Sequence, residues 1–122
     1  MASQENFTAV TLEAGQDLST KQYCFMTVAA DGQIDPTGAG LMAQGVLQDQ
    51  PAAAGRAALV AIEGKVKVVC GAAVTRGGPV ASTSTGTATN ATTGNIILGT
   101  ALETGASGRI IEILFHPRGA AA

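Results

Sequence analysis

Short runs of apolar residues, interrupted by glycine, proline and small polar residues, recur along most of the chain. The runs are rich in valine, isoleucine and other residues that favour strands. In one of them Val66, Val68 and Cys70 alternate with Lys65 and Lys67, so the two sets occupy opposite faces of a strand. The pattern predicts strands over residues 22–29, 41–47, 56–64, 65–70, 96–102 and 109–115, and a short strand near residue 80.

Helical periodicity is nearly absent, and the alanine-rich residues 51–54 form at most a loop or a short helical turn. Many short strands punctuated by glycine and proline indicate an all-β fold, either a small β-barrel or a sandwich. Residues 31–40 are dense in Asp, Gly and Pro and predict consecutive turns. Residues 81–93 are of low complexity and rich in Ser and Thr, which predicts an exposed loop without core residues. Their β-branched threonines leave an edge strand as the alternative.

Two segments of the chain resemble each other, GLMAQGVLQDQPAAAGRAALVAIEGKV (Gly40–Val66) and NIILGTALETGASGRIIEILF (Asn95–Phe115). Each reads as two strands joined by a loop of small residues, so we interpret them as an internal hairpin pseudo-repeat within one barrel. A single hairpin is marginally stable in water, whereas two can cover each other. Gly45 and Gly99 lie inside the first strand of each copy and predict a bulge or a close approach of backbones.

The length of 122 residues is typical of one domain. We expect an N-terminal arm or loosely held first strand over residues 1–21, a β-domain over residues 22–116 and a flexible tail over residues 117–122. Within the first of these segments, residues 7–12 (FTAVTL) form a weak apolar stretch.

The composition limits the size of the core and the class of partner. Aromatic residues make up 3% of the chain, tryptophan is absent, and much of the apolar content is alanine, which buries little area. We therefore expect association with further copies or with a partner. Charged residues are 13% with a net charge of −2, and the densest basic site is Lys65 with Lys67. A nucleic-acid surface needs many more cations, so that class is disfavoured. Neither a signal peptide nor a membrane span is predicted.

Candidate catalytic and metal-binding residues are few. Without a secretion signal, Cys24 and Cys70 predict two buried free thiols, with a disulfide or a metal pair as the alternative. His116 is the only histidine, and we expect it to be exposed and without a function. Asp31 and Asp35 are interpreted as turn residues because their spacing does not match a calcium loop. The sequence therefore predicts no enzyme, no catalytic, cofactor-binding or metal-binding residue, and no cofactor.

Three segments carry a resemblance to a known family: DLSTKQYCFMTV, the first copy of the repeat continued through KVVCGAAVTRGGPV, and ILGTALETGASGRIIEILFHPRG. They resemble phage and prophage capsid cement, or decoration, proteins, a family long labelled only as a domain of unknown function. The resemblance spans about residues 14–119 and is clearest in G-V-L-x-x-x-P-A-A-A-G-R, in V-x-x-x-G-x-x-K-V-V and in G-x-A-L-E. The Ser/Thr-rich segment from Ala81 departs from the family pattern.

The resemblance implies a β-tulip-like fold and a homo-oligomer, usually a trimer, on the outer surface of the virion capsid. It also implies the phage major capsid protein as partner, a role in stabilising the shell, and synthesis in the host cytoplasm. A small trimeric β-barrel enzyme, or a carbohydrate-binding or host-adhesion module, is the alternative. The enzyme motifs are missing, and Tyr23 is the one Trp or Tyr that could serve a sugar site.

Overall fold

The computed structural model describes residues 7–121, and within them all regular structure is β. This confirms the all-β class. The strands are β1 (Phe7–Ala14), β2 (Phe25–Val28), β3 (Gln33–Pro36), β4 (Gly45–Leu47), β5 (Ala57–Val69), β6 (Pro79–Ser82), β7 (Ala88–Asn90), β8 (Gly99–Ala101) and β9 (Ile110–Phe115).

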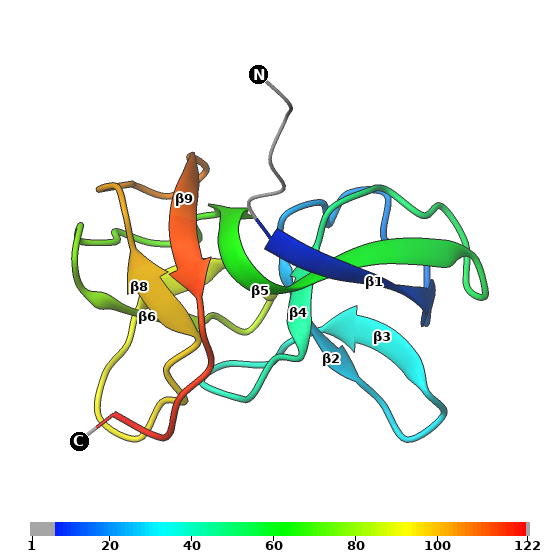
Figure 1. The fold of residues 1–122 in the computed structure, drawn as a ribbon, viewed down its shortest axis with the longest axis horizontal. Helices are drawn as coiled ribbons and strands as arrows, with labels where there is room; N and C mark the ends of the chain where they lie inside the picture. The colour runs from blue at the N-terminus through cyan, green and yellow to red at the C-terminus, as the bar shows by residue number, and fades with distance from the viewer. Residues whose placement is uncertain (1–6, 122) are drawn as a thin grey trace.

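The strands form one sheet that curls into two rings sharing β5. The order is β1-β3-β2-β4-β5-β9-β8-β6-β7, and a second pairing of β1 with β5 closes the first five strands into a ring. The remaining strands continue from β5, and a bridge between Cys70 and Ala88 joins the end of β5 to β7. Figure 1 shows the result as two lobes, with β1, β2 and β3 in one, β6, β8 and β9 in the other, and β5 between them.

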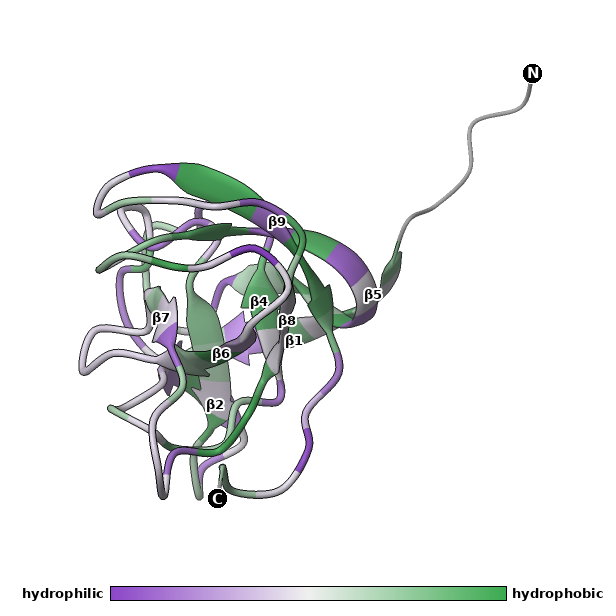
Figure 2. Ribbon diagram, turned by 90° about the vertical axis from the view of Figure 1, so that its left-hand side faces the viewer, coloured by the Kyte–Doolittle hydropathy of each residue, from purple (hydrophilic) through white to green (hydrophobic). Residues whose placement is uncertain are grey.

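β5 is a single strand of 13 residues, which corrects the expectation of separate strands over residues 56–64 and 65–70. Gly64 has φ of +109°, a conformation that glycine adopts at little cost, so the strand can bend there without ending. Gly64 pairs with Phe7 of β1 on one side and with Phe115 of β9 on the other. The bend is therefore the point at which β5 passes from the first ring to the second. In Figure 2 the charged residues of β5 show as purple on a largely green strand.

Each ring encloses its own hydrophobic core, and the strands between the rings are buried on both faces. Leu18, Met26, Ile34, Leu47 and Val60 belong to the core of the first ring. The second core contains Phe25, Val46, Ala61, Val66, Val68, Val80, Leu98, Ile111, Ile113 and Phe115. Consecutive residues of a strand point to opposite faces. β2, β4 and β5 can therefore supply one core from Phe25, Val46 and Ala61 and the other from their immediate neighbours Met26, Leu47 and Val60.

Two glycines allow strands to approach closely, as the sequence predicted. A Cβ on Gly45 would collide with Val60 and with the carbonyl oxygen of Ala61. A Cβ on Gly99 would collide with the carbonyl oxygen of Leu114. β4 pairs antiparallel with β5, and β8 pairs antiparallel with β9, so each half of the pseudo-repeat contains one antiparallel pair. The pseudo-repeat itself remains an interpretation.

Two segments differ from the expectation drawn from their composition. Residues 31–40, expected as consecutive turns, contain β3, which pairs with β2 and runs parallel to the end of β1. Residues 81–93, expected as an exposed loop without core residues, contribute part of the β6–β7 hairpin. Ala81 and Ala88 of that hairpin are fully buried. The alternative of an edge strand was the better prediction, since β7 ends the strand order.

The two ends of the described chain are hydrogen-bonded to the rest of it. Residues 7–14 are the strand β1, the second of the two alternatives for this segment, and residues 1–6 of the expected arm lie outside the described residues. Near the other end, the backbone N–H of Arg118 donates to Ile97 at 2.7 Å and that of Ala121 donates to Asn95 at 2.8 Å. These bonds hold part of the segment that we expected to be a flexible tail.

Candidate binding groove along β5

Within the described residues, the segment Lys65–Val68 of β5 has a neighbouring strand on one side only. β9 pairs with Gly64–Val69 along its whole length. On the opposite side β1 begins at Phe7, which pairs with Gly64, and the next contact is the Val69 N–H donating to the Tyr23 carbonyl at 3.0 Å. Between these two contacts, no strand of residues 7–121 pairs with this side of Lys65–Val68. Within residues 7–121 the register of β1 on β5 thus leaves a gap in the sheet beside Lys65–Val68.

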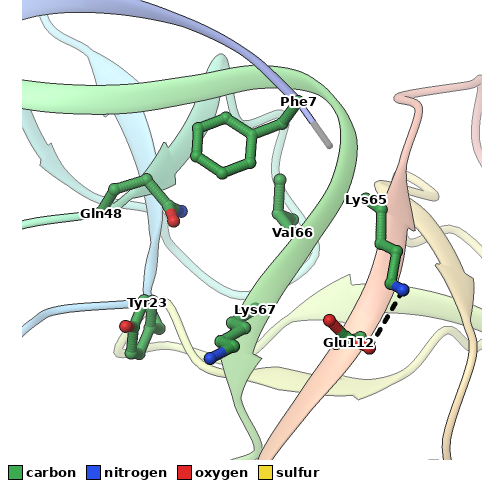
Figure 3. A pocket seen from close by; sticks show the side chains of 7 residues that line it. All are labelled: Phe7, Tyr23, Gln48, Lys65, Val66, Lys67 and Glu112. Carbon is green, nitrogen blue, oxygen red and sulfur yellow. Dashed lines mark ion pairs between the residues drawn. The ribbon is translucent and has the colours of Figure 1, made fainter. Parts of the chain in front are cut away.

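The gap is an open groove of about 200 Å³. Figure 3 shows Phe7 and Tyr23 at its two ends, Val66 and Lys67 on β5, and Gln48 on the far side. Val66 is buried in the second core, and Phe7 packs against that core, so the floor of the groove is apolar. The walls carry the polar groups, namely the side chains of Gln48, Lys65, Lys67 and Glu112.

Tyr23 adopts an unusual backbone conformation at one end of the groove. Its φ is +67°, which costs a non-glycine residue on the order of 1–3 kcal/mol. Its N–H donates to the Leu47 carbonyl at 2.7 Å, and its own carbonyl accepts from Val69. These two bonds tie the turn before β2 to the ends of β4 and β5, and the phenol ring lies beside Lys67 (Figure 3). The sequence had placed Tyr23 in a strand, but it lies in the turn before β2.

The charges of the groove are only partly compensated. Lys65 Nζ lies 3.5 Å from Glu112 Oε1, and both side chains are more than a third exposed. Such a pair contributes roughly 0–1 kcal/mol to stability because water screens it. Lys67 lies opposite Glu112 in the β5–β9 ladder, yet among residues 7–121 it forms no ion pair. The groove therefore carries one uncompensated positive charge, close to Tyr23.

A second hollow continues the groove over β9. Its volume is about 380 Å³, and it shares Tyr23, Lys67 and Glu112 with the first. It adds Glu103, Ile111 and Ile110, of which Ile110 is 51% exposed. Leu114, on the same outer face of β9, is 46% exposed. The face around the groove thus combines exposed apolar side chains with a few charges.

The residues considered earlier for chemistry are scattered. Cys24 and Cys70 are both free and buried, as predicted, but belong to the first and the second core respectively. Burial raises the pKa of each thiol above its ordinary value, which keeps it protonated and weakly nucleophilic. His116 is exposed after the end of β9, as expected.

The two aspartates also lie apart. Asp31 accepts a hydrogen bond from the Gln33 N–H in a turn, as predicted, whereas Asp35 lies in β3 and accepts one from Gln16 Nε2. Within residues 7–121 no group of three or more His, Cys, Asp or Glu side chains is arranged to hold a metal ion. No catalytic constellation is assembled by these residues.

Sequence reasoning missed the groove although it singled out the strand beside it. The alternation over residues 65–70 correctly placed Lys65 and Lys67 on the solvent face. The gap among the described residues depends on the pairing of Phe7 with Gly64 and on the conformation of Tyr23. Neither has a local sequence signal, since positive φ at a tyrosine is rare.

Comparisons with known proteins agree with this reading of the fold. The chain is similar to the head fiber gp8.5 N base of bacteriophage phi29, with a TM-score of 0.72 and 16% identity. The match covers 95% of this chain and 98% of the phi29 chain, and at this identity it shows a shared fold. No curated protein matches the sequence significantly.

The residues described here contain no helix that could cross a membrane. The family of phage cement proteins matches residues 5–114, which is most of the sequence. Together with the fold, this match identifies a structural protein associated with the phage capsid. The chain belongs to the phage cement protein family.

Proposed function

We propose that this protein binds the outer surface of the major capsid shell and stabilises the assembled particle, after synthesis in the host cytoplasm. The observation that carries the proposal is the match to the cement family over residues 5–114. A protein that binds only the assembled shell shifts the equilibrium between intact and ruptured particles toward the intact one. This role requires binding surfaces and a rigid scaffold, and it requires no catalytic group.

The scaffold has features that suit such a role. The two rings have separate cores and share β5, although within the described residues the second is closed only by the bridge between Cys70 and Ala88. Large apolar side chains remain exposed at Val10, Leu41, Met42, Leu59, Ile110 and Leu114. Contacts with the shell can therefore bury apolar area, which suits a chain with few charges.

We further propose that the protein acts as a homotrimer. Each copy is small and poor in aromatic residues, so a single contact with the shell is weak. Linking three copies raises the strength of binding through effective concentration without any stronger individual contact. Native mass spectrometry of protein released from particles should show trimers, and spectra containing monomers alone would contradict this part of the proposal.

The stabilising role is tested by heating particles that contain or lack the protein. DNA release is followed with an intercalating dye, and purified protein is added back to the deficient particles as a control. We expect deficient particles to assemble but to release DNA at a lower temperature, and the added protein to restore the original curve. Identical release curves would contradict the cement role and would favour host adhesion at the same surface.

A further inference from the structure

The backbone of β5 turns its hydrogen-bonding groups alternately toward β9 and toward the groove. The Cys70 N–H donates to Arg109, on the β9 side, at 2.7 Å. The Val69 N–H donates to Tyr23, on the groove side, at 3.0 Å. The register between β5 and β9 is unbroken from Gly64 to Val69, so this alternation continues along the strand. The N–H and C=O groups of Lys65 and Lys67 therefore point into the groove, whereas those of Val66 and Val68 bond to β9.

No described residue pairs with these groove-facing groups of Lys65 and Lys67. An open strand edge of this kind is a template for another extended chain, because main-chain bonds supply affinity and alternate side chains supply specificity. We propose that the groove accepts one extended strand of a capsid subunit, which pairs with Lys65–Val68 and fills the gap in the sheet. This inference rests on the proposed function and names the contact through which it acts.

The groove sets the size and the chemistry of that strand. The gap spans the residues between the contacts of Phe7 and Tyr23, a length of about 13 Å at ~3.3 Å per residue. An apolar side chain of the incoming strand would lie on Val66 and Phe7, which form the floor. An acidic side chain on the solvent face would meet Lys67, which has no ion pair in residues 7–121. A strand that follows the line of β1 would run antiparallel to β5, as β1 does.

Amide hydrogen exchange tests the inference residue by residue. The protein is exchanged in D₂O either free or bound to shells of the major capsid protein of the same phage. It is then quenched, released and analysed by mass spectrometry with fragmentation. We expect the Lys65 and Lys67 amides to exchange rapidly in the free protein and at least tenfold more slowly on the shell. The Val66 and Val68 amides, which bond to β9, should be slow in both states and serve as internal references.

A matched pair of variants at one position separates the backbone from the side chain. Lys67→Pro removes the N–H that faces the groove and places its ring in the path of an added strand. Lys67→Ala removes the charge and keeps the N–H. We expect Lys67→Pro to weaken shell binding at least tenfold more than Lys67→Ala, with both variants checked for a native melting transition. Should Lys67→Pro fail to fold, Lys67→Glu takes its place and should weaken binding by repelling the acidic strand.

The outcomes distinguish this inference from the proposed function. A wild-type protein that does not bind shells contradicts both. A wild-type protein that binds, while Lys65 and Lys67 exchange as in the free state, overturns the strand inference alone. Protection of these amides in the free protein that is lost on deleting residues 2–6 would assign the groove to the chain's own N-terminal segment. Protection that appears only at high protein concentration would assign it to a second copy. Either result overturns the inference.

Discussion

Phe25 and Met26 are neighbours in β2, yet their side chains lie in different hydrophobic cores. Phe25 packs against Phe115 of β9 in the second core, with ring centroids 6.1 Å apart and ring planes inclined at 30°. Met26 lies among Ile34, Leu47 and Val60 in the first core. Since both side chains are fully buried, a shift of β2 disturbs both cores at once.

Because β2, β4 and β5 supply side chains to both cores, we predict that the two rings unfold together. Met26→Ala in the first core should cost about 2–5 kcal/mol, and Phe115→Ala in the second about 3–5 kcal/mol, because each leaves a cavity. Each variant should lower the temperature of one common transition. Differential scanning calorimetry checks this through the ratio of calorimetric to van't Hoff enthalpy, which should be close to one. Two resolved transitions, with each variant moving a different one, would show that the rings are independent.

The close strand approaches predict that a single methyl group is costly at two glycines. Gly45→Ala and Gly99→Ala place a Cβ against backbone atoms of the neighbouring strand, so each should lower the free energy of unfolding by about 1–3 kcal/mol. Gly119→Ala is the matched control, because its Cβ would meet no atom within 4 Å. Chemical denaturation measures all three variants. Equal stability of the Gly99 and Gly119 variants would refute the close approach.

The buried thiols predict a loss of stability in alkali. Burial raises the pKa of Cys24 and of Cys70 above the ordinary value of 9.0, because the charged thiolate is poorly solvated inside the protein. Above about pH 9 the unfolded chain loses these protons before the folded chain does. The stability is therefore complete below pH 9 and declines as the pH rises through the raised values. Denaturation midpoints measured between pH 7 and pH 10.5 should show this decline.

A double variant provides the control for the alkaline effect. Cys24→Ala with Cys70→Ala should start from a lower stability, since both side chains are buried, but should decline less between pH 9 and pH 10.5. A thiol reagent gives an independent measure, because both cysteines should react slowly in the native protein and rapidly in denaturant. An unchanged slope in the double variant would mean that other groups cause the decline.

Two truncations should differ sharply because β1 closes the first ring. Deleting residues 2–13 removes nearly all of the ladder from Phe7↔Gly64 to Glu13↔Ala57 and uncovers the core around Val60. That variant should lose its cooperative melting transition. Deleting residues 2–6 keeps β1 and should melt close to the full-length protein. Circular dichroism during heating compares the two, and a cooperative transition in the longer truncation would show that the first ring closes without β1.

The sequence predicted the strands whose own residues carry the signal. Val66 and Val68 alternate with lysines, and Ile110–Phe115 is a β-branched apolar run interrupted only by Glu112, so both segments were correctly predicted to be extended. β3 was missed because Asp, Gly and Pro dominate its surroundings. Ile34 nevertheless pairs with Val28 of β2 and with Ala14 of β1, and these tertiary contacts outweigh the local preference for turns.

The groove could not be predicted because it is a relation between distant segments. It exists because Phe7 pairs with Gly64, which leaves Lys65 beyond the end of the described β1. Its other end depends on Tyr23, whose φ of +67° is maintained by bonds to Leu47 and Val69. A one-residue change in the β1–β5 register would move the boundary of the groove and reverse the faces of β1.

The pairing of Gly64 with both Phe7 and Phe115 also bears on how the chain reaches its native state. Gly64 joins one strand that lies far before it in the sequence to another that lies far after it, so neither neighbour is local. Closing such loops precedes any gain from the contacts, which makes folding slow relative to proteins with local contacts. During synthesis, Val66 and Val68 stay uncovered until Ile110–Phe115 leaves the ribosome. The nascent chain is therefore prone to aggregation until this strand has emerged and paired with β5.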